Sequence, residues 1–586
     1  MKQVTRTWSV PTSPRNPYKI ANELKLLSTF KGKIWNKKTQ LEFAMMLPSV
    51  ESFEGVGSKA YSDFSARDRI NRAPKSFGFV RFDKDRIINI TGAGKQLMAG
   101  TRIDELFLRQ LLKWQYPSPN HADKNYSKNF CIKPFLEVLR IINALGGITK
   151  YELAIFCIPL LRYSDTAQVI QRIKKFRKSI QSKKSNIERK KYIKNVFCER
   201  FLHVYQEDVA LGNFRKREGI ARTREEFINT KIGNSKDYAD AAIRYFRATG
   251  LFSISTRTYR LILKDEKKEM VNFLLSHTNP MPKEYLPSPG DFLTYLGAAD
   301  APKLPQDDKK MLLNEIQQTI QLHKNRGIVI KADSFRDAKR LKKSNVETIK
   351  DYKDRLIIQL EKKVIQKSQD KLKDFRNLGE IMDVFNKINE RAYDEIPDRP
   401  LFFEWNMWRA FSLLDDGDIK GNLKIDSNGA PVNTAIGNMP DMECYYKDFV
   451  LVIEVTLSSG QRQYETEGEP VSRHVAQVAA RLKRDNDKRP VYGLFIASYL
   501  NPSAIAHFYI VRQTNVKFYG GKIKIIPLQL NHFLEMMKHA GEARGIKSVD
   551  IYKFVKWADN QAESSSDESE WYDAITRNVS QWTRVN

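Results

Sequence analysis

Residues 440–456 read PDMECYYKDFVLVIEVT, two runs of β-forming residues on either side of the polar pair Lys447–Asp448. The pattern predicts a tight hairpin with this polar pair at its turn. Counting outward from the turn places Asp441 directly opposite Glu454, where the two side chains project from the same face. Thr456 shares that face, two residues beyond Glu454. Two carboxylates at this separation repel each other unless a cation lies between them.

Glu454 also follows five apolar residues, which is the pattern of a buried strand. A buried carboxylate is unfavourable unless it is paired or binds a metal ion. We therefore expect Asp441 and Glu454 to bind a divalent cation, and the alternative is a pair of ordinary carboxylates at a strand end. Because the ligands are oxygens, Mg²⁺ is expected, with Mn²⁺ as a substitute, rather than zinc.

The sequence after the hairpin predicts a helix that carries further polar groups. Residues 470–484 are expected to form this helix, which leads to a buried strand at 491–496, so that strand, helix and strand make a crossover. Glu467 precedes the helix, and His474 lies in its first turns. Both side chains are therefore candidates for the same site.

Upstream, residues 400–414 are expected to form a helix that places Glu404 on the side occupied by Trp408 and Phe411. A charged group on an aromatic face requires a partner. Completion of the metal site would supply one, and an ion pair with an arginine is the alternative.

The chain of 586 residues has 99 Lys and Arg against 69 Asp and Glu, a formal net charge of +30. Such an excess favours a polyanionic partner, because each neutralised phosphate releases counterions. The alternatives are a merely cationic protein and a ribosome-associated one. A chain of this length is also expected to form several domains.

The first part of the N-terminal half has the outline of a winged helix. Strands are predicted at 77–82 and 86–90, and Thr91 is expected to cap the helix that follows. A basic cluster precedes this wing, and we interpret it as a DNA contact, with a solvated surface as the alternative. Its members are Arg67, Arg69, Arg72 and Lys75.

The second part repeats this outline. A helix at 134–145, a glycine turn and a helix capped by Thr149 form a helix-turn-helix pattern, and strands at 251–255 and 258–263 form another wing. A run of lysines and arginines lies between them, and either a solvated helix face or contact with phosphates explains it. The run includes Lys174, Lys175 and Arg177.

Prolines are concentrated between residues 279 and 306, and the charged helical stretch after them has a narrow apolar stripe, as expected of a spacer. The acidic stretch 563–570 is expected to be a flexible surface segment. We therefore predict a multidomain α+β chain with four parts. They are two winged-helix DNA-recognition subdomains at 1–120 and 121–278, a helical linker at 279–395 and an α/β domain with a mixed sheet at 396–586 that holds the acidic site.

The four cysteines are too far apart in the sequence for a zinc ribbon or a redox pair. No stretch is long and apolar enough for a signal peptide or a membrane span. The sequence therefore indicates a soluble protein of the cytoplasm.

These patterns resemble a known family. The order of Glu404, Asp441 and Glu454, followed by a helix, is similar to the core of the PD-(D/E)xK nucleases. More closely, and over nearly the whole chain, the sequence resembles the AlwI group of type IIS restriction endonucleases and the related BstNBI-like nicking endonucleases. The segments that carry the likeness include FSARDR at 64–69, LKWQYPS at 112–118, RYFRATGLF at 244–252, FEW at 403–405, GNMPDME at 437–443 and EPVSRH at 469–474.

The resemblance implies the residues of the catalytic site. Carried over by position, the metal ligands are Asp441 and Glu454, with Glu404 as the third. The wider acidic set adds one more carboxylate, and a histidine lies nearby. These two residues are Glu467 and His474.

One departure from the wider superfamily bears on catalysis. That superfamily has a lysine where this sequence has Thr456. We therefore assign activation of the attacking water to the metal ion, with help from Glu467 or His474. The resemblance also implies DNA contacts in the segment that contains Arg244 and Arg247.

The function that the resemblance implies is site-specific cleavage of double-stranded DNA, of type IIS character. The enzyme would read a short asymmetric sequence and hydrolyse phosphodiester bonds a few bases to one side, as a double-strand cutter or as a nickase. We expect a prokaryotic restriction–modification enzyme that is a monomer when free, with a transient dimer or a second subunit for double-strand cleavage. The alternatives are a DNA-binding protein with a decayed nuclease domain and a transposase-like or RNA-processing nuclease.

Overall fold

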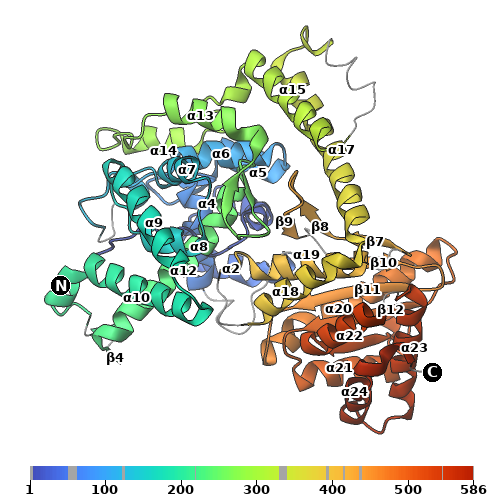
Figure 1. Cartoon of the computed structure of the whole chain (residues 1–586). Coiled ribbons are helices and arrows are strands. Elements are labelled where there is room, and N and C mark those ends of the chain that lie inside the picture. The colour runs from blue at the N-terminus through green and yellow to red at the C-terminus, as the bar shows by residue number, and fades with distance from the viewer. Residues whose placement is uncertain are drawn as a thin grey trace. The chain divides into compact units, whose positions relative to one another are not determined.

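The chain folds into two compact units, which Figure 1 draws as a cartoon. Unit 1 comprises Met1–Phe53 and Ser58–Leu360, and unit 2 comprises Glu361–Asn586. The boundary between them lies within the segment 279–395 that the sequence predicts as a linker. The structure is a computed structural model, and it describes residues 4–50, 63–121, 126–214, 216–217, 220–328, 340–390, 395–413, 416–434, 439–543 and 546–584.

The N-terminal part of unit 1 contains the first predicted hairpin. Strands β1 (Val80–Phe82) and β2 (Ile88–Ile90) pair antiparallel. Thr91 caps the following helix α5 (Gly92–Ala99), because its hydroxyl accepts a hydrogen bond from the Gly94 N–H at 3.1 Å. The predicted strands and cap are therefore confirmed. The other helices of this part are α1 (Ile20–Ser28), α2 (Lys37–Met46), α3 (Asp63–Asn71), α4 (Ala73–Ser76) and α6 (Ile103–Lys113).

The second predicted hairpin is also present, as β5 (Phe252–Ile254) paired antiparallel with β6 (Leu261–Leu263). Gly146 ends the preceding helix with a φ of 70°, a conformation that favours glycine. Thr149 then starts α8 (Lys150–Glu152) with a capping box, as predicted. The other elements of this part are α7 (Pro134–Leu145), α9 (Thr166–Gln181), α10 (Asn186–Val204), α11 (Gln206–Ala210), β3 (Lys216–Arg217), β4 (Ile220–Ala221) and α12 (Arg224–Arg247).

The apolar stripe predicted on the helical linker is buried. Ile349, Tyr352, Leu356 and Leu360 on α17 (Val346–Leu372) are each at most 7% exposed. This burial explains why so charged a helix folds against its neighbours. The helices before it are α13 (Lys268–His277), α14 (Pro289–Gly297) and α15 (Lys309–Asn325).

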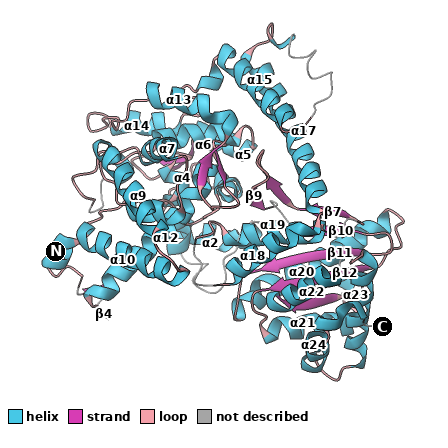
Figure 2. Cartoon of the chain, viewed as in Figure 1, coloured by secondary structure: helices cyan, strands magenta, loops and turns pink. Residues whose placement is uncertain are grey.

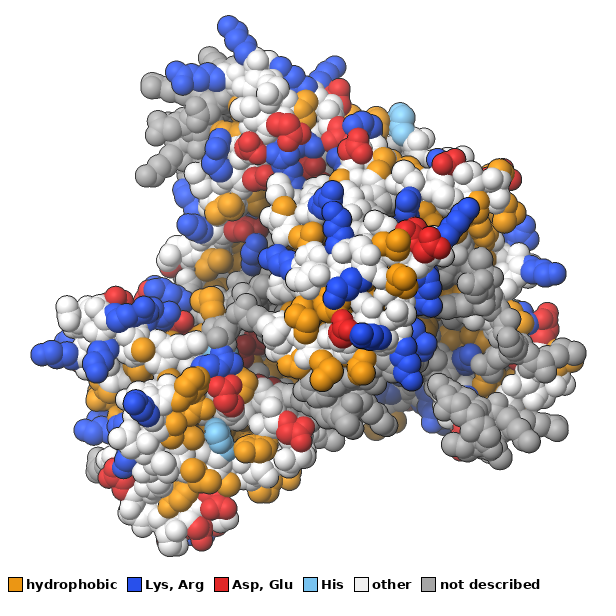
Figure 3. Space-filling model, turned by 180° about the vertical axis from the view of Figure 1, so that it is seen from behind, with side chains coloured by type: hydrophobic (Ala, Val, Ile, Leu, Met, Phe, Trp, Pro, Cys, Tyr) orange, Lys and Arg blue, Asp and Glu red, His pale blue; other side chains and the backbone are white. Residues whose placement is uncertain are grey.

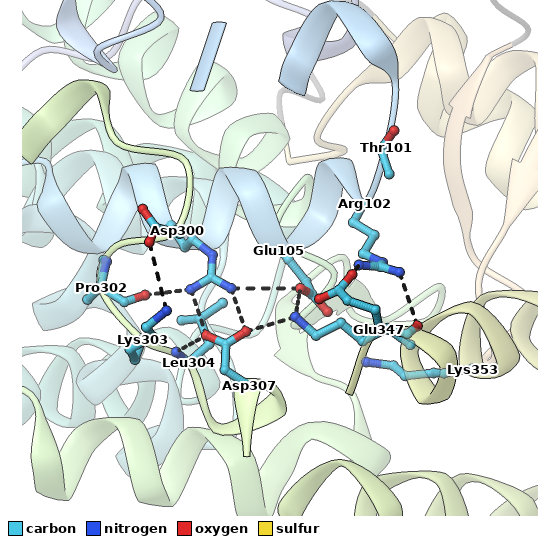
Figure 4. A network of polar contacts seen from close by, with 12 residues as sticks. Thr101, Arg102, Glu105, Asp300, Pro302, Lys303, Leu304, Asp307, Glu347 and Lys353 are labelled. Carbon is cyan, nitrogen blue, oxygen red and sulfur yellow. Dashed lines mark hydrogen bonds and ion pairs between the residues drawn. The ribbon is translucent and has the colours of Figure 1, made fainter. Parts of the chain in front are cut away.

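Ion pairs attach α17 to the rest of unit 1 (Figure 4). Lys350 on α17 donates to Glu105 at 2.9 Å and to Asp307 at 2.8 Å. Arg109 also pairs with Asp307, at 2.8 Å. Lys350, Glu105 and Arg109 are all buried, so each charge in this network has an opposite charge next to it.

A second set of charges lies between α15 and its neighbours. The Glu315 carboxylate pairs with Lys267 and, at 3.1 Å, with Lys353, and all three side chains are at most 10% exposed. Burial alone would raise the pKa of Glu315, but the two ammonium groups outweigh it and lower the pKa to about 2. Glu315 is therefore ionised throughout the ordinary pH range.

Unit 2 is built on a five-stranded mixed sheet in the order β13–β12–β11–β10–β7, whose strands are magenta in Figure 2. The pairs β11–β12 and β12–β13 are parallel, and β10 pairs antiparallel with both β11 and β7. A mixed sheet in a mostly helical α+β fold confirms the predicted class. The strands of unit 2 are β7 (Asp418–Gly421), β8 (Leu423–Ile425), β9 (Pro431–Thr434), β10 (Met442–Tyr445), β11 (Val450–Thr456), β12 (Val491–Ala497) and β13 (Ile525–Gln529).

The acidic stretch 563–570, predicted to be a flexible segment, is instead largely helical. It ends α23 (Ser548–Ser564) and starts α24 (Glu568–Arg577). Asp567 caps α24 by accepting a hydrogen bond from the Glu570 N–H at 2.8 Å. Acidic side chains stabilise a helix N-terminus, a role that low sequence complexity conceals. The remaining helices of unit 2 are α18 (Leu378–Asn389), α19 (Arg399–Ser412), α20 (Gln461–Arg484), α21 (Pro502–Gln513) and α22 (Leu530–Ala543).

Two expectations from composition can also be compared with the fold. None of the helices in the described ranges is long and apolar enough to span a lipid bilayer. The four cysteines are free thiols.

Candidate active site

The predicted catalytic residues gather at the open end of the β10–β11 hairpin. The register pairs Met442 with Ile453, and the turn is the predicted pair Lys447–Asp448. Continuing this register by one position places Asp441 opposite Glu454. The register deduced from the sequence is therefore confirmed.

Asp441 and Glu454 share a small, mostly buried space. The Val455 N–H donates to Oδ2 of Asp441 at 2.8 Å, which holds that carboxyl group against β11. Burial raises the pKa of both carboxyl groups well above their usual values. Repulsion adds to this shift, chiefly from Glu454 for Asp441 and from Glu467 for Glu454. A cation placed here would remove that repulsion.

Helix α20 begins at Gln461, and not at Pro470 as predicted. A proline is favoured in the first turn of a helix because it lacks a backbone N–H, and this preference misled the prediction. The earlier start is anchored by Gln463, whose side-chain amide donates to the carbonyls of Ser458 at 2.9 Å and Tyr499 at 2.7 Å. Glu467 is thus a helix residue and not part of a loop.

Because α20 is continuous, Glu467, His474 and Arg481 lie seven residues apart on one side of it. Nδ1 of His474 lies 2.5 Å from Oε1 of Glu454. The Thr456 hydroxyl donates to Oε1 of Glu467 at 3.0 Å. The helix therefore delivers two of the predicted side chains to the same edge of the sheet. Burial lowers the pKa of His474.

Thr456 lies two residues beyond Glu454, and its hydroxyl makes two hydrogen bonds. Besides donating to Glu467, it accepts a hydrogen bond from the Ser458 N–H at 3.0 Å. The side chain is 7% exposed. Thr456 therefore links the strand to the side of α20 that carries Glu467. No local sequence pattern signals this link, because the two residues come from different elements.

Glu404 on α19 faces the same cluster. Its side chain is half-buried, and its carboxyl group forms no hydrogen bond or ion pair with the described residues. The same helix has two arginines: Arg409 pairs with Glu380, at 2.9 Å, and Arg399 donates to the carbonyl of Ile388. Burial raises the pKa of Glu404 well above its usual value, and repulsion from Asp441 is the next largest cause. The arginine partner considered from the sequence is thus not present in the described structure.

The chemistry of these carboxyl groups fits a divalent cation. They offer oxygen ligands, they repel one another, and Glu404, Asp441 and Glu467 remain partly exposed. In the parts of the chain that the structure describes, no three His, Cys, Asp or Glu side chains are already arranged to hold a metal ion. The ligands would therefore have to adjust their side-chain positions when a cation binds.

Comparison with known proteins gives this geometry its context. The profile of the AlwI restriction endonuclease family matches residues 75–536. The chain belongs to the AlwI restriction endonuclease family. The match includes every predicted site residue in unit 2, and family membership implies a site-specific DNA endonuclease.

Two solved structures are similar to parts of this AlwI-family chain. The small subunit of the heterodimeric restriction endonuclease R.BspD6I is 23% identical with a TM-score of 0.29, over 34% of this chain and 98% of that subunit. The BpuJ1 endonuclease binding domain, in a complex with pyrene- and phenanthrene-modified DNA, is 11% identical with a TM-score of 0.32, over 51% of this chain and 98% of that domain. No curated protein matches the chain.

The AlwI-family chain also has a charged pocket beside the hairpin, which the sequence analysis did not identify. The pocket has a volume of about 510 Å³, and its lining includes Lys420, Arg481 and Arg489. Asn422, another lining residue, donates its backbone N–H to the Asp441 carbonyl at 2.9 Å. Basic groups thus lie next to the acidic cluster. The sequence contains one signal for this pocket: Arg481 follows His474 by seven residues, so the two lie on the same side of α20.

The residues predicted to contact DNA occupy two kinds of environment in the AlwI-family structure. Lys and Arg side chains spread over the face drawn in Figure 3, so exposure alone does not single out a contact surface. Those held in contacts within unit 1 are Arg69 with Glu23, Arg72 with Thr12, Arg177 with Glu152, Arg244 with Asp240, and the buried Arg247. Arg67, Arg72, Lys174 and Lys175 are exposed, and Lys75 is half-buried.

Proposed function

We propose that this chain is a type IIS endonuclease with a PD-(D/E)xK-type centre, in which unit 1 reads a short asymmetric DNA sequence and unit 2 hydrolyses DNA nearby. One observation carries the proposal. Asp441 and Glu454 face each other at a hairpin end with raised pKa values, and neither has a Lys or Arg partner among the described residues. The described residues contain one such centre, so the proposed enzyme nicks one strand unless a second subunit cuts the other.

Mg²⁺ is the proposed cofactor, with Mn²⁺ as a substitute, held by Asp441 and Glu454 with Glu404 as a third ligand. When bound, the cation supplies charge that neutralises the phosphoryl oxygens and polarises the attacking water. The chain itself orients the ligands. The Val455 N–H fixes Asp441, and His474 holds Glu454.

Glu467 is the proposed positioning group for the attacking water. Its Oε1 accepts the Thr456 hydroxyl, which orients the carboxylate beside Glu454. Thr456 cannot itself serve as a general base, because a neutral hydroxyl near a metal ion does not readily take up a proton at neutral pH. This arrangement replaces the lysine of the wider superfamily with a Thr–Glu pair.

Two winged-helix subdomains, at 1–120 and 121–278, are the proposed DNA-reading part of unit 1. In both subdomains, one residue that lies between two helices forms a β-bridge to the hairpin and so occupies the place of a third strand. Ile34 pairs with Ile87 in the first, and Ile148 pairs with Leu261 in the second, both antiparallel. A helix pair packed on a three-stranded wing is the arrangement by which such domains present a helix to the major groove.

Cleavage of supercoiled plasmid in Mg²⁺, followed by sequencing of the new ends, tests the proposal. The expected result is breaks or nicks at a fixed offset from one short asymmetric sequence. The matched control is Asp448→Asn, which removes an exposed carboxylate at the hairpin turn and should leave the activity unchanged.

Two results would refute the proposal. Sequence-specific binding without cleavage in either Mg²⁺ or Mn²⁺ would indicate a DNA-binding protein with a decayed nuclease. Ends scattered over the plasmid, or cleavage of RNA alone, would indicate a different class of nuclease.

A further inference from the structure

Helices α9 and α10 form a hairpin with a large excess of positive charge. Phe176 on α9 stacks on Tyr192 on α10 with ring centroids 5.9 Å apart, and Ile173 and Phe197 are buried on the inner faces. Residues 166–204 contain twelve Lys and Arg but only two Glu. Since the apolar groups face inward, the charge lies on the outer faces of the two helices.

The acidic residues nearby do not neutralise this surface. Glu188 accepts a hydrogen bond from the Lys184 backbone N–H at 3.0 Å, and Glu199 has no ion pair with a described residue. Arg177 is held by Glu152 at 2.6 Å. The exposed side chains of the hairpin without an ion pair to any described residue are Lys174, Lys175, Lys178, Lys184, Arg189, Lys191 and Lys194.

Arg200 on α10 differs from these exposed cations. It is half-buried, and its Nε has no hydrogen-bond partner among the described residues. Burial lowers the pKa of Arg200 to about 10, and the like charge of Arg172 on α9 adds to that shift. A desolvated cation without an opposite charge is unfavourable. An anion bound between the two guanidinium groups would offset this cost.

Helical spacing extends this pair into a surface. Lys175 follows Arg172 by three residues, so the two lie on the same side of α9. Arg189 precedes Arg200 by eleven residues, which is close to three full turns, so these two share a side of α10. We call these four residues the hairpin cation surface.

We propose that the hairpin cation surface binds the phosphate backbone of duplex DNA without reading its sequence, with Arg172 and Arg200 holding one phosphate together. A guanidinium group matches phosphate oxygens with paired hydrogen bonds, and the regular spacing of phosphates suits cations placed along two helices. The choice of DNA over another polyanion rests on the proposed function. The observation that the charge of Arg200 is not balanced by the described residues does not depend on the proposed function.

The test compares wild type with Arg172→Gln/Arg200→Gln in the full chain. Binding of two labelled duplexes, one with the recognition sequence and one scrambled, is followed by fluorescence anisotropy in EDTA over a series of salt concentrations. We expect both affinities to fall by the same factor, and the slope of log affinity against log salt to become shallower by about two. Lys553→Gln/Lys556→Gln on α23 removes the same charge from exposed positions and should change neither.

Thermal stability is a second measurement, and its expected result differs from that for an arginine with a purely structural role. Arg200→Met keeps the bulk of the side chain and removes the unpaired charge, so its Tm should equal or exceed that of wild type. A lower Tm would show that Arg200 has a structural partner and would overturn the proposal. An unchanged salt slope, or a loss confined to the duplex with the recognition sequence, would overturn it as well.

Failure of the proposed function has a separate signature. It would appear as absence of plasmid cleavage by wild type, whereas the salt slopes are measured without any cleavage. If wild type binds neither duplex but binds an acidic polypeptide through the same arginines, the partner is a protein and the DNA assignment is wrong.

Discussion

Two groups of carboxylates that are largely shielded from water have opposite surroundings in this molecule. In unit 1, Glu315 lies between Lys267 and Lys353. In unit 2, Asp441 and Glu454 have each other as neighbours, with no Lys or Arg ion pair among the described residues. The pKa of Glu315 falls to about 2, whereas the pKa values of Asp441 and Glu454 rise.

This contrast shows that burial of charge does not by itself mark a functional site. Both regions are shielded from water, but only one lacks the opposite charge that a stable fold normally provides. A buried carboxylate with two lysines stabilises helix packing. Buried carboxylates without a cation cost stability and are kept for what they bind.

The largest expected effect is a loss of cleavage, in the region where the carboxylates have no Lys or Arg partner. Asp441→Asn keeps the acceptor for the Val455 N–H but removes a ligand charge, so cleavage should fall at least about a thousand-fold while DNA binding stays within several-fold. Without Mg²⁺ the variant should be more stable than wild type, because one source of repulsion is gone. Single-turnover cleavage and thermal unfolding measure the two effects. Near-normal turnover would show that Asp441 is not part of the catalytic site.

On the paired side, the same kind of change should act on stability instead. Glu315→Gln leaves two buried ammonium groups without their partner and should destabilise unit 1 by about 3–5 kcal/mol. Hydrogen exchange of the α15 amides in the full chain reports this local loss. The control is Glu42→Gln, whose partner Lys33 is exposed and 3.6 Å away, with an expected change below about 1 kcal/mol. Equal losses of stability from the two substitutions would show that Glu315 does not stabilise unit 1 through its buried ion pairs.

The pH dependence of unit 1 follows from the same carboxylate. Because the pKa of Glu315 is lowered on folding from 4.5 to about 2, its stabilisation is complete above pH 4.5 and is lost as pH falls toward 2. Wild type should therefore lose stability across this window more steeply than Glu315→Gln. Thermal unfolding at several pH values between 5 and 2 measures the difference, and parallel curves would contradict the assignment.

The smallest expected effect concerns the Thr–Glu pair beside the site. Thr456→Val removes the hydrogen bond to Glu467 and should slow single-turnover cleavage on the order of ten-fold, while Thr456→Ser, which keeps the hydroxyl, should stay close to wild type. Glu467→Gln should be slower than Thr456→Val. The reverse order at saturating Mg²⁺ would mean that the hydroxyl, and not the carboxylate, acts on the attacking water.

The sequence predicted the hairpin of the site correctly because its determinants are local. A polar pair at the turn and alternation along two short strands suffice to place Asp441 opposite Glu454. The caps at Thr91 and Thr149 were predictable for the same reason. In each case the residues that decide the structure lie within a few positions of one another.

The errors have the opposite origin. The early start of α20 depends on Gln463, which is anchored by a residue from a distant loop, Tyr499. Likewise, the sequence cannot show that Arg177 is held by Glu152, or that Arg200 on the next helix has no partner for its Nε among the described residues. Charge runs are visible in a sequence, but the pairing that makes a cation structural or available is a tertiary property.

The seven-residue spacing on α20 limits how this enzyme can vary in length. Three side chains of α20 each contact a residue of the sheet, and they are Glu467, His474 and Arg481. Inserting or deleting a single residue between them would rotate every later side chain by about 100° and shift it by about 1.5 Å along the helix axis, so the three contacts could not all form. Substitutions at the exposed positions between these three residues should therefore be better tolerated than insertion or deletion of a single residue.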